Sequence, residues 1–505
     1  MNQPIRIRWL LGLISGPLFF TLIILFGNLD PGNPAVTYTL ATAVWMAIWW
    51  ISESVPLAIT SLLPVVLFPL LGVMDGKSVS STYFNHVIFL FIGGFIVALA
   101  MQKWDLHKRI ALKILMAIGV GPGRILLGCM IATAFLSMWI SNTATTMMMI
   151  PILISIISKL DDTIGKEGSS KYSIGLLLGV AYSASIGGIS TLVGTPPNLS
   201  FTRIFQISFP EAPEISFAQW FFFAFPITVV FLAIVWVYLY YRFRPDKSLW
   251  KHIDQSSFRE EYRQLGRTTI EQKIILADFI LLALLWLTRS DIVFGNLVIP
   301  GWSGIFKTPA FINDGTVAIM MSVPLFFIPS RSDAGRYLMD WSTATKLPWN
   351  IVLLFGGGFA LATGFIESGL SDWFGNQLSW VSWIHPIFII ALIALMMTFL
   401  TELTSNTATT EMMLPILAGL SVSIEINPLL LMIPATLAAS MAFMLPVATP
   451  PNAIIFGTNR LRIIDMAKTG FVLNMIGVII ITLATYFYGS YIFGIDVAVF
   501  PDWAR

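Results

Sequence analysis

One twelve-residue stretch occurs twice in this chain and decides how its fold is predicted. Residues 141–152 read SNTATTMMMIPI, and residues 405–416 read SNTATTEMMLPI, with ten of twelve positions identical. The same offset of 264 residues relates FIGGF at 91–95 to FGGGF at 355–359. Repetition of two motifs at one offset indicates a duplicated unit.

A third motif recurs after each copy of this stretch. It reads GTPPN at 194–198 and ATPPN at 448–452. Two consecutive prolines cannot continue a helix, so each copy predicts a helix that is broken inside a long apolar segment. Both units therefore follow one order: a glycine-rich helix, an SNT segment and a proline break.

The composition places these units in a membrane. Of 505 residues, 56% are hydrophobic and 11% charged, and the mean hydropathy is +0.81. Such a chain lacks the charge that covers a soluble protein, and a spanning helix needs about 20 apolar residues. We predict an all-α polytopic membrane protein with about 11 transmembrane helices, at 9–27, 35–52, 54–74, 85–102, 173–208, 217–241, 272–290, 314–330, 350–367, 428–458 and 470–494.

The two segments that carry SNT are predicted to be re-entrant hairpins. Residues 124–160 and 384–422 each consist of two short apolar arms around a polar centre. Arms of this length are marginal for crossing a core about 30 Å thick. Irregular backbone at that depth is tolerated when protein surrounds it, so we expect each tip to lie buried near the midplane.

Charge sets the orientation and the domain boundaries. With the N-terminus in the cytoplasm and each hairpin returning to its own side, 24 of the 29 Lys and Arg fall on the cytoplasmic side. The C-terminus is then extracytoplasmic. Each unit has five crossings, so the units form an inverted repeat. The predicted divisions are a first helix and loop at 1–34, repeat 1 at 35–241, a charged cytoplasmic linker at 242–271 and repeat 2 at 272–505.

The hairpin tips have the chemistry of an anion site. Ser, Asn and Thr cap helices and leave backbone N–H groups free at the start of the second arm, where the helix dipole also favours negative charge. Asn142 and Thr143 add side-chain donors on one side, and Asn406 and Thr407 add them on the other. Because neither tip carries Lys or Arg, co-bound cations are expected to balance the charge.

Oxygen atoms suited to those cations lie in the same segments. Ser137 and Thr401 each precede a tip serine by four residues, which places them one helical turn away on the same face. The proline breaks free carbonyl groups near Gly194 and Ala448. Uncharged oxygen ligands favour a hard alkali cation such as Na⁺.

Several other functions are disfavoured. A net charge of +2 makes nucleic acid an unexpected partner, and the single Cys129 excludes an intramolecular disulfide and a cysteine cluster. No HExxH or GxxxxGK[ST] motif occurs, so neither a zinc enzyme nor an ATP-driven pump is indicated. We predict a transporter with no enzymatic activity and no organic cofactor. An ion channel is an alternative, and it would differ from a transporter by carrying a passive ionic current instead of saturable uptake driven by a Na⁺ gradient.

Two buried-segment acids break the repeat symmetry. Glu402 and Glu411 correspond to Met138 and Met147 of the first unit. Ionisable residues in apolar segments are functional hypotheses. Either a role in substrate or proton binding or a place in an interfacial salt bridge fits them.

The motifs resemble those of the divalent anion/sodium symporter family, the INDY-like transporters of dicarboxylates, citrate and sulfate. The resemblance rests on both SNT copies, TAFLSMWISNTATT at 133–146 and LPVATPPNAI at 445–454. It implies a scaffold domain and a mobile transport domain, an elevator-type mechanism, a homodimer, and a cell (inner or plasma) membrane location. It also implies Na⁺-coupled symport of a C4-dicarboxylate such as succinate; Na⁺-coupled citrate or sulfate transport and Na⁺-independent dicarboxylate exchange are alternatives.

The same resemblance assigns ligands by motif. It implies that the substrate is bound by Asn142, Thr143, Asn406 and Thr407, helped by the turns at Thr195-Pro196 and Thr449-Pro450. One sodium site would use Ser137, Ser141, Asn142 and Gly194, and the other Thr401, Ser405, Asn406 and Ala448.

Overall fold

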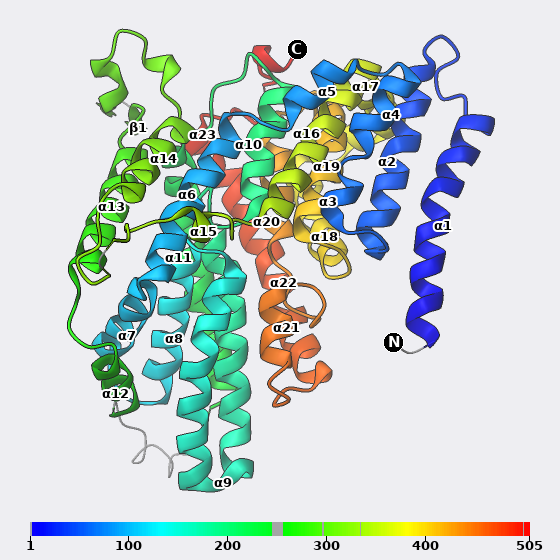
Figure 1. The fold of residues 1–505 in the computed structure, drawn as a ribbon. Coiled ribbons are helices and arrows are strands. Elements are labelled where there is room, and N and C mark those ends of the chain that lie inside the picture. The colour runs from blue at the N-terminus through cyan, green and yellow to red at the C-terminus, as the bar shows by residue number, and fades with distance from the viewer. Residues whose placement is uncertain (1–2, 245–255, 295–296, 334, 498) are drawn as a thin grey trace.

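A computed structural model describes residues 3–244, 256–294, 297–333, 335–497 and 499–505. In these residues the chain is mostly helical, which confirms the predicted all-α polytopic class (Figure 1). The α-helices are α1 (Gln3–Phe26), α2 (Pro34–Ser52), α3 (Leu57–Thr60), α4 (Leu63–Leu71), α5 (Gly76–Thr82), α6 (His86–Lys103), α7 (Leu106–Ile118), α8 (Pro122–Ser137), α9 (Asn142–Gly188), α10 (Pro196–Ser208), α11 (Phe217–Arg242), α12 (Ser256–Gln264), α13 (Ile270–Leu287), α14 (Asp314–Ser322), α15 (Trp341–Ala344), α16 (Trp349–Ser368), α17 (Leu370–Leu378), α18 (Pro386–Thr401), α19 (Asn406–Ser423), α20 (Leu429–Ala439), α21 (Pro450–Phe456), α22 (Ile463–Leu483) and α23 (Ser490–Phe493).

The remaining elements are short. An antiparallel hairpin of β1 (Ile292–Phe294) and β2 (Leu297–Ile299) follows α13, a feature that the all-α prediction did not include. A π-helical turn at Ala484–Gly489 extends α22. Single 3₁₀ turns lie at Trp302–Ile305, Pro309–Phe311, Val323–Phe326, Ser379–Trp383 and Asp502–Ala504.

Helix length separates two kinds of membrane segment. Within the described residues, seven helical segments are long and apolar enough to span a bilayer, and five more apolar helices have 10–17 residues. Two of the predicted crossings are not single continuous α-helices. The crossing at 54–74 is divided between α3 and α4, and the one at 314–330 passes from α14 into a 3₁₀ turn at Val323–Phe326, where Pro324 cannot continue the α-helix.

Each hairpin segment forms two helices joined by a short connection at its SNT motif. In the first, α8 ends at Ser137 and α9 begins at Asn142. In the second, α18 ends at Thr401 and α19 begins at Asn406. The first hairpin was predicted to end at residue 160. Instead, α9 continues beyond that residue and changes direction at Gly165. That residue has φ of 76°, a conformation that glycine adopts without strain.

The linker predicted at 242–271 is described only in part. Residues 245–255 lie outside the described residues, whereas 256–264 form α12. Arg109 of α7 reaches this segment and donates to the carbonyl oxygens of Leu265 and Gly266 at 2.9 and 3.1 Å. The linker therefore continues into α13 along the surface of α7.

Two apolar clusters hold the helices together. The larger contains residues of both repeats, from Val87 on α6 to Ile481 on α22. The smaller joins α2 and α4 to α16 through Trp50, Phe68 and Phe365. Helix α16 contributes to both clusters, with Phe365 in the smaller and Phe355 and Phe359 in the larger. Ala408 of the hairpin helix α19 also belongs to the smaller one.

Candidate functional site: two hairpin tips against two broken helices

The tip of the first hairpin is closed by its own polar side chains. Ser141 caps α9, and its Oγ accepts a hydrogen bond from the Ala144 N–H at 3.2 Å. Ser137, at the end of α8, donates from Oγ to Asn142 Oδ1 at 2.6 Å. The hydroxyl predicted from its spacing therefore does reach the tip. Asn142 and Thr143 are partly exposed at the start of α9.

The second tip repeats this arrangement. Thr401 Oγ1 lies 2.6 Å from Asn406 Oδ1 and 2.8 Å from the Ala439 carbonyl oxygen. Ser405 occupies the capping position of α19, but unlike Ser141 its hydroxyl makes no capping hydrogen bond. Thr407 follows in the first turn and is buried. The bond between the hydroxyl and the Asn side chain is thus the feature common to both tips.

The first proline break brings backbone oxygens to the tip. Helix α9 ends at Gly188, and α10 begins at Pro196 after Thr195 in an extended conformation. A Cβ atom built on Gly194 would lie 2.4 Å from the Gly188 oxygen and 3.0 Å from the Met138 oxygen. One on Gly188 would lie 2.7 Å from Asn142 Oδ1 and 3.2 Å from the Gly194 oxygen. The lack of side chains at both positions therefore lets these oxygens lie close to the two glycines; the Met138 oxygen also accepts a hydrogen bond from the Thr191 hydroxyl.

The converging atoms suit a cation. The Asn142 side-chain oxygen and three carbonyl oxygens, together with the Ser137 hydroxyl, are neutral oxygen ligands of the kind that hard cations prefer. Of the predicted set, Ser137, Asn142 and Gly194 meet here, whereas the Ser141 hydroxyl is engaged in the helix cap. Met138 and Gly188, whose carbonyl oxygens lie near this set, were not predicted, because neither lies in the SNT or TPPN motif.

The second break has the same frame. Helix α20 ends at Ala439, and α21 begins at Pro450 after Thr449, whose Oγ1 accepts from the Asn452 N–H at 3.3 Å. Ala448 lies buried in the connecting segment, where its N–H donates to the Leu445 oxygen at 3.2 Å. This predicted ligand lies in the same segment as Ala439, whose oxygen contacts Thr401.

The asparagine of each TPPN motif was missed as a site residue. Asn198 donates from Nδ2 to the Thr191 oxygen at 2.7 Å and lies 3.4 Å from the Gly188 oxygen. Asn452 donates at 3.0 Å to the oxygens of Ala442 and Leu445, which occupy the corresponding positions in the second unit. Both side chains fix the backbone of the breaks through these hydrogen bonds. The occurrence of Asn in both TPPN motifs could have indicated this role from the sequence.

Contacts between the two repeats unite these parts. Tyr182, in the second half of α9, donates from its hydroxyl to the Phe443 oxygen in the second break at 2.8 Å. Ser200 of α10 donates from Oγ to Glu411 Oε1 of α19 at 2.5 Å. The broken segment of each repeat therefore contacts the other repeat, at the second break in one case and at the hairpin helix α19 in the other.

Glu402 is part of this frame. Its Oε1 accepts from the Phe443 and Met444 N–H groups at 2.7 and 2.8 Å and from Asn474 Nδ2 at 2.8 Å. Its Oε2 accepts from the Leu445 N–H at 3.1 Å. The side chain thus ties the end of α18 to the second break. These contacts are hydrogen bonds from backbone and amide N–H groups and not the salt bridge that the sequence left open.

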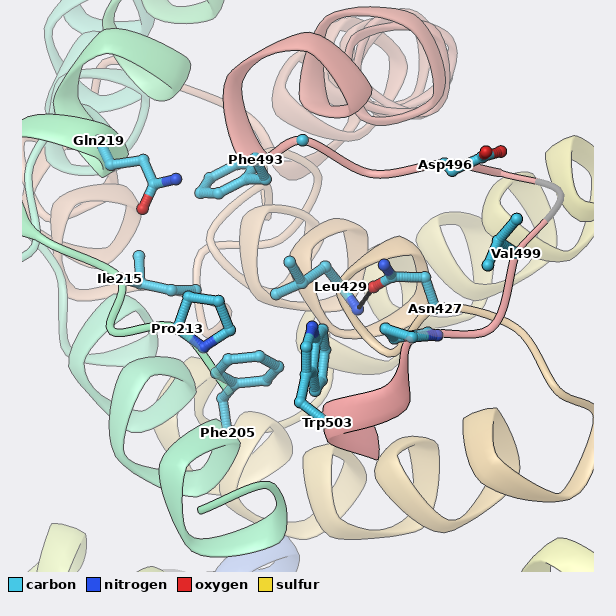
Figure 2. A pocket seen from close by; sticks show the side chains of 12 residues that line it. Phe205, Pro213, Ile215, Gln219, Asn427, Leu429, Phe493, Asp496, Val499 and Trp503 are labelled. Carbon is cyan, nitrogen blue, oxygen red and sulfur yellow. Dashed lines mark hydrogen bonds between the residues drawn. The ribbon is translucent and has the colours of Figure 1, made fainter. Parts of the chain in front are cut away.

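A separate cavity lies at the ends of α10 and α20. It has a volume of about 210 Å³ and is enclosed by the C-terminal segment (Figure 2). Its wall is mixed and includes three aromatic side chains, those of Phe205, Phe493 and Trp503, with Trp503 packed edge-on against Phe205 at 5.5 Å between ring centroids. The residues lining it include none of the predicted ligands.

The site's motifs and geometry can now be compared with known proteins. The sequence profile of the sodium:sulfate symporter transmembrane region matches residues 11–495. The chain belongs to the sodium:sulfate symporter family. This confirms the resemblance drawn from the SNT and TPPN motifs.

Relatives of this symporter-family chain span nearly its full length. The sodium-dependent dicarboxylate transporter SdcS of Staphylococcus saprophyticus is 43% identical over 502 residues, which is 98% of this chain and 94% of that protein. SdcS of Staphylococcus aureus is 44% identical over 504 residues, with the same coverage. The match includes both hairpins and both breaks.

Two solved structures share the fold of this family member. One is Neisseria gonorrhoeae MtrF, described with a class of antimetabolite efflux pumps, at a TM-score of 0.53 and 13% identity, covering 92% of this chain and 97% of that one. The other is the Alcanivorax borkumensis YdaH transporter, at 0.54 and 12%, covering 90% and 98%. At such identities the likeness extends to the fold alone.

Proposed function

We propose that this protein is a secondary transporter that carries a C4-dicarboxylate such as succinate together with Na⁺. The observation that carries the proposal is the pair of tips in which a hydroxyl bonds an Asn side chain at 2.6 Å beside the carbonyl oxygens of a broken helix. The names of the two SdcS relatives support the choice of sodium and dicarboxylate.

The two ends of such a substrate would be held by the two helix starts. The first turns of α9 and α19 offer unpaired N–H groups, and their dipoles favour negative charge. Asn142, Thr143, Asn406 and Thr407 would add donors, with the turns at Thr195-Pro196 and Thr449-Pro450 nearby. Two sodium ions at the oxygen clusters would balance the two carboxylates and fit the neutral donor sets present.

Movement would follow an elevator scheme. In this scheme the hairpins and broken helices form the transport domain, while α2, α4 and α16 belong to a scaffold. The packing of α16 against α2 and α4 through Trp50, Phe68 and Phe365 supports the grouping of these three helices. The proposal includes the two repeats at 35–241 and 272–505, a homodimer through the scaffold, a cytoplasmic N-terminus and a cell-membrane location.

Uptake into proteoliposomes tests the proposal. With an inward Na⁺ gradient, purified protein is expected to accumulate labelled succinate, and replacement of Na⁺ by K⁺ should abolish accumulation. Excess unlabelled dicarboxylate should compete, whereas citrate and sulfate should compete weakly. Succinate exchange that persists without Na⁺ would instead identify a dicarboxylate exchanger.

Thermal stability provides an independent test of binding. A ligand that binds only the folded protein stabilises it by about 2.7 kcal/mol at a concentration 100 times its Kd. Succinate should therefore raise the melting temperature when Na⁺ is present and have little effect without it. A larger shift with sulfate or citrate than with succinate would contradict the assigned substrate.

A further inference from the structure

Glu411 is a buried acid for which the proposed transport cycle has so far no use. It lies on α19, five residues beyond Asn406, and is fully buried, whereas its repeat partner Met147 is 61% exposed. Its Oε1 accepts from Ser200 Oγ at 2.5 Å, and among the described residues its Oε2 has no hydrogen-bond partner. One carboxyl oxygen is therefore buried without a donor.

That oxygen lies directly against another helix. A Cβ atom built on Gly358 of α16 would lie 1.9 Å from Glu411 Oε2, so only glycine leaves space for the carboxyl group. The preceding glycines are equally crowded, since Cβ atoms on Gly356 and Gly357 would meet Tyr83 and Ser61 at 2.1 and 2.5 Å. The carboxyl group thus sits at the contact between the hairpin arm and α16.

No positive charge balances this carboxyl group in the described part of the chain. None of the ion pairs found there includes Glu411. The helices packed against α19 carry few charges. The charged residues on these helices are Arg203 on α10, Glu367 on α16, Asp372 on α17, and Glu53 and Glu402 at the ends of α2 and α18; α20 has none. The charge of Arg203 interacts with His86.

We propose that Glu411 is a proton-binding site, and that its carboxyl group is neutral while α19 packs against α16. An ionised carboxylate buried without a partner is destabilised by several kcal/mol, and protonation removes that penalty. The proton would come from water when the contact is open and return to water when it opens again. This inference rests on the proposed elevator movement, in which α19 slides past α16.

The pH dependence of uptake tests the functional part. Uptake is measured with saturating Na⁺ between about pH 7.5 and 9, where a substrate dicarboxylate is almost fully ionised. Wild-type uptake should fall toward alkaline pH, because ionised Glu411 cannot repack against Gly358. Glu411→Gln, which resembles the neutral acid, should transport and lose the alkaline fall. An unchanged fall in Glu411→Gln, or a flat wild-type profile, would overturn the proposal.

Two further variants sharpen this test. Ser200→Ala removes a donor that favours the ionised form, so the midpoint of the fall should rise by about one pH unit. If the pH midpoint of Ser200→Ala is unchanged or lower than that of the wild type, Glu411 is not the proton-binding site. Glu367→Gln changes an exposed carboxyl group on α16 and should keep the wild-type profile. Loss of the alkaline fall in this control would also overturn the assignment to Glu411.

Infrared spectroscopy tests the protonation state without transport. The wild type minus Glu411→Gln difference spectrum at neutral pH should contain the carbonyl stretch of a protonated carboxylic acid. If only a carboxylate band is found, the proposal fails. Should Glu411→Gln not fold, the shift in Ser200→Ala still decides the question. Absence of Na⁺-driven uptake at every pH would refute the transport proposal, while the spectrum would judge the proton site alone.

Discussion

At the scale of single residues, two asparagines in each repeat have different tasks. Asn142 and Asn406 stand at the tips, where each accepts a hydrogen bond from a hydroxyl at 2.6 Å. Asn198 and Asn452 are fully buried and donate to carbonyl oxygens of the breaks. The first pair would bind ligands, and the second keeps the ligand-bearing backbone in place.

The tip hydroxyl groups should determine sodium affinity. Ser137→Ala and Thr401→Ala remove an oxygen that orients Asn142 or Asn406, a loss of about 1–1.5 kcal/mol. We expect the Na⁺ concentration for half-maximal uptake to rise by about tenfold in each variant. Ser137→Thr and Thr401→Ser keep the hydroxyl and serve as controls. An unchanged Na⁺ requirement in both alanine variants would contradict the assignment.

The break asparagines should affect stability more than binding chemistry. Asn198→Ala or Asn452→Ala leaves buried carbonyl oxygens unpaired, which destabilises the fold by about 1–3 kcal/mol. The ligand-free melting temperature should therefore decrease. By contrast, Asn142→Ala and Asn406→Ala should abolish uptake with little change in that temperature. Equal melting temperatures for all four variants would show that the two pairs are not functionally distinct.

At the scale of elements, close helix approach decides the shape of the site. Helix α9 crosses α8 near Gly187, where a Cβ atom would lie 2.3 Å from the Ala134 carbonyl oxygen. The neighbouring Gly188 carries one of the oxygens that converge on the first tip. A small change in this crossing would therefore displace that oxygen, which the proposed function places beside Na⁺.

A methyl group at this crossing should disturb both packing and transport. Gly187→Ala must push α9 away from the α8 backbone, and such overpacking destabilises by about 1–3 kcal/mol. We expect a lower melting temperature and a higher Na⁺ requirement. Gly304→Ala is the control, because a Cβ there meets no atom within 4 Å. If Gly187→Ala behaved like this control, the crossing would not be as tight as described.

At the scale of the whole molecule, hydrogen bonds join the two repeats around the proposed site. Contacts such as Tyr182 to Phe443 and Ser200 to Glu411 cross from one repeat to the other. Helix α16 packs with α2 and α4 in the smaller cluster and also contacts α19, where Gly358 meets Glu411. Under the proposed elevator scheme, α16 with α2 and α4 would stay fixed while the group of helices that includes α19 moves past it.

A disulfide between these groups tests whether they move. The double variant Gly358→Cys and Glu411→Cys, in a Cys129→Ala background, places two thiols where the helices touch. Oxidation should link α16 to α19 and abolish uptake, and reduction should restore it. The reduced protein is the matched control. Full uptake by the oxidised, linked protein would exclude sliding at this contact.

The sequence alone determined the class of fold and the elements of the site. Its apolar segments, repeated SNT and TPPN motifs and low charge predicted an all-α membrane protein of this family, because these are local patterns. The spacing of Ser137 and Thr401 also predicted their contact with the tips, since it depends only on one helical turn.

The tertiary structure alone decided which oxygens and carboxyl groups meet. The carbonyl oxygens of Met138 and Gly188 carry no side-chain signal, so their convergence depends on how α8 and α9 pack. The environments of Glu402 and Glu411 likewise differ because distant segments supply their neighbours: backbone N–H groups for the first and a glycine surface for the second. Local sequence cannot specify such contacts, since they form between residues far apart in the chain.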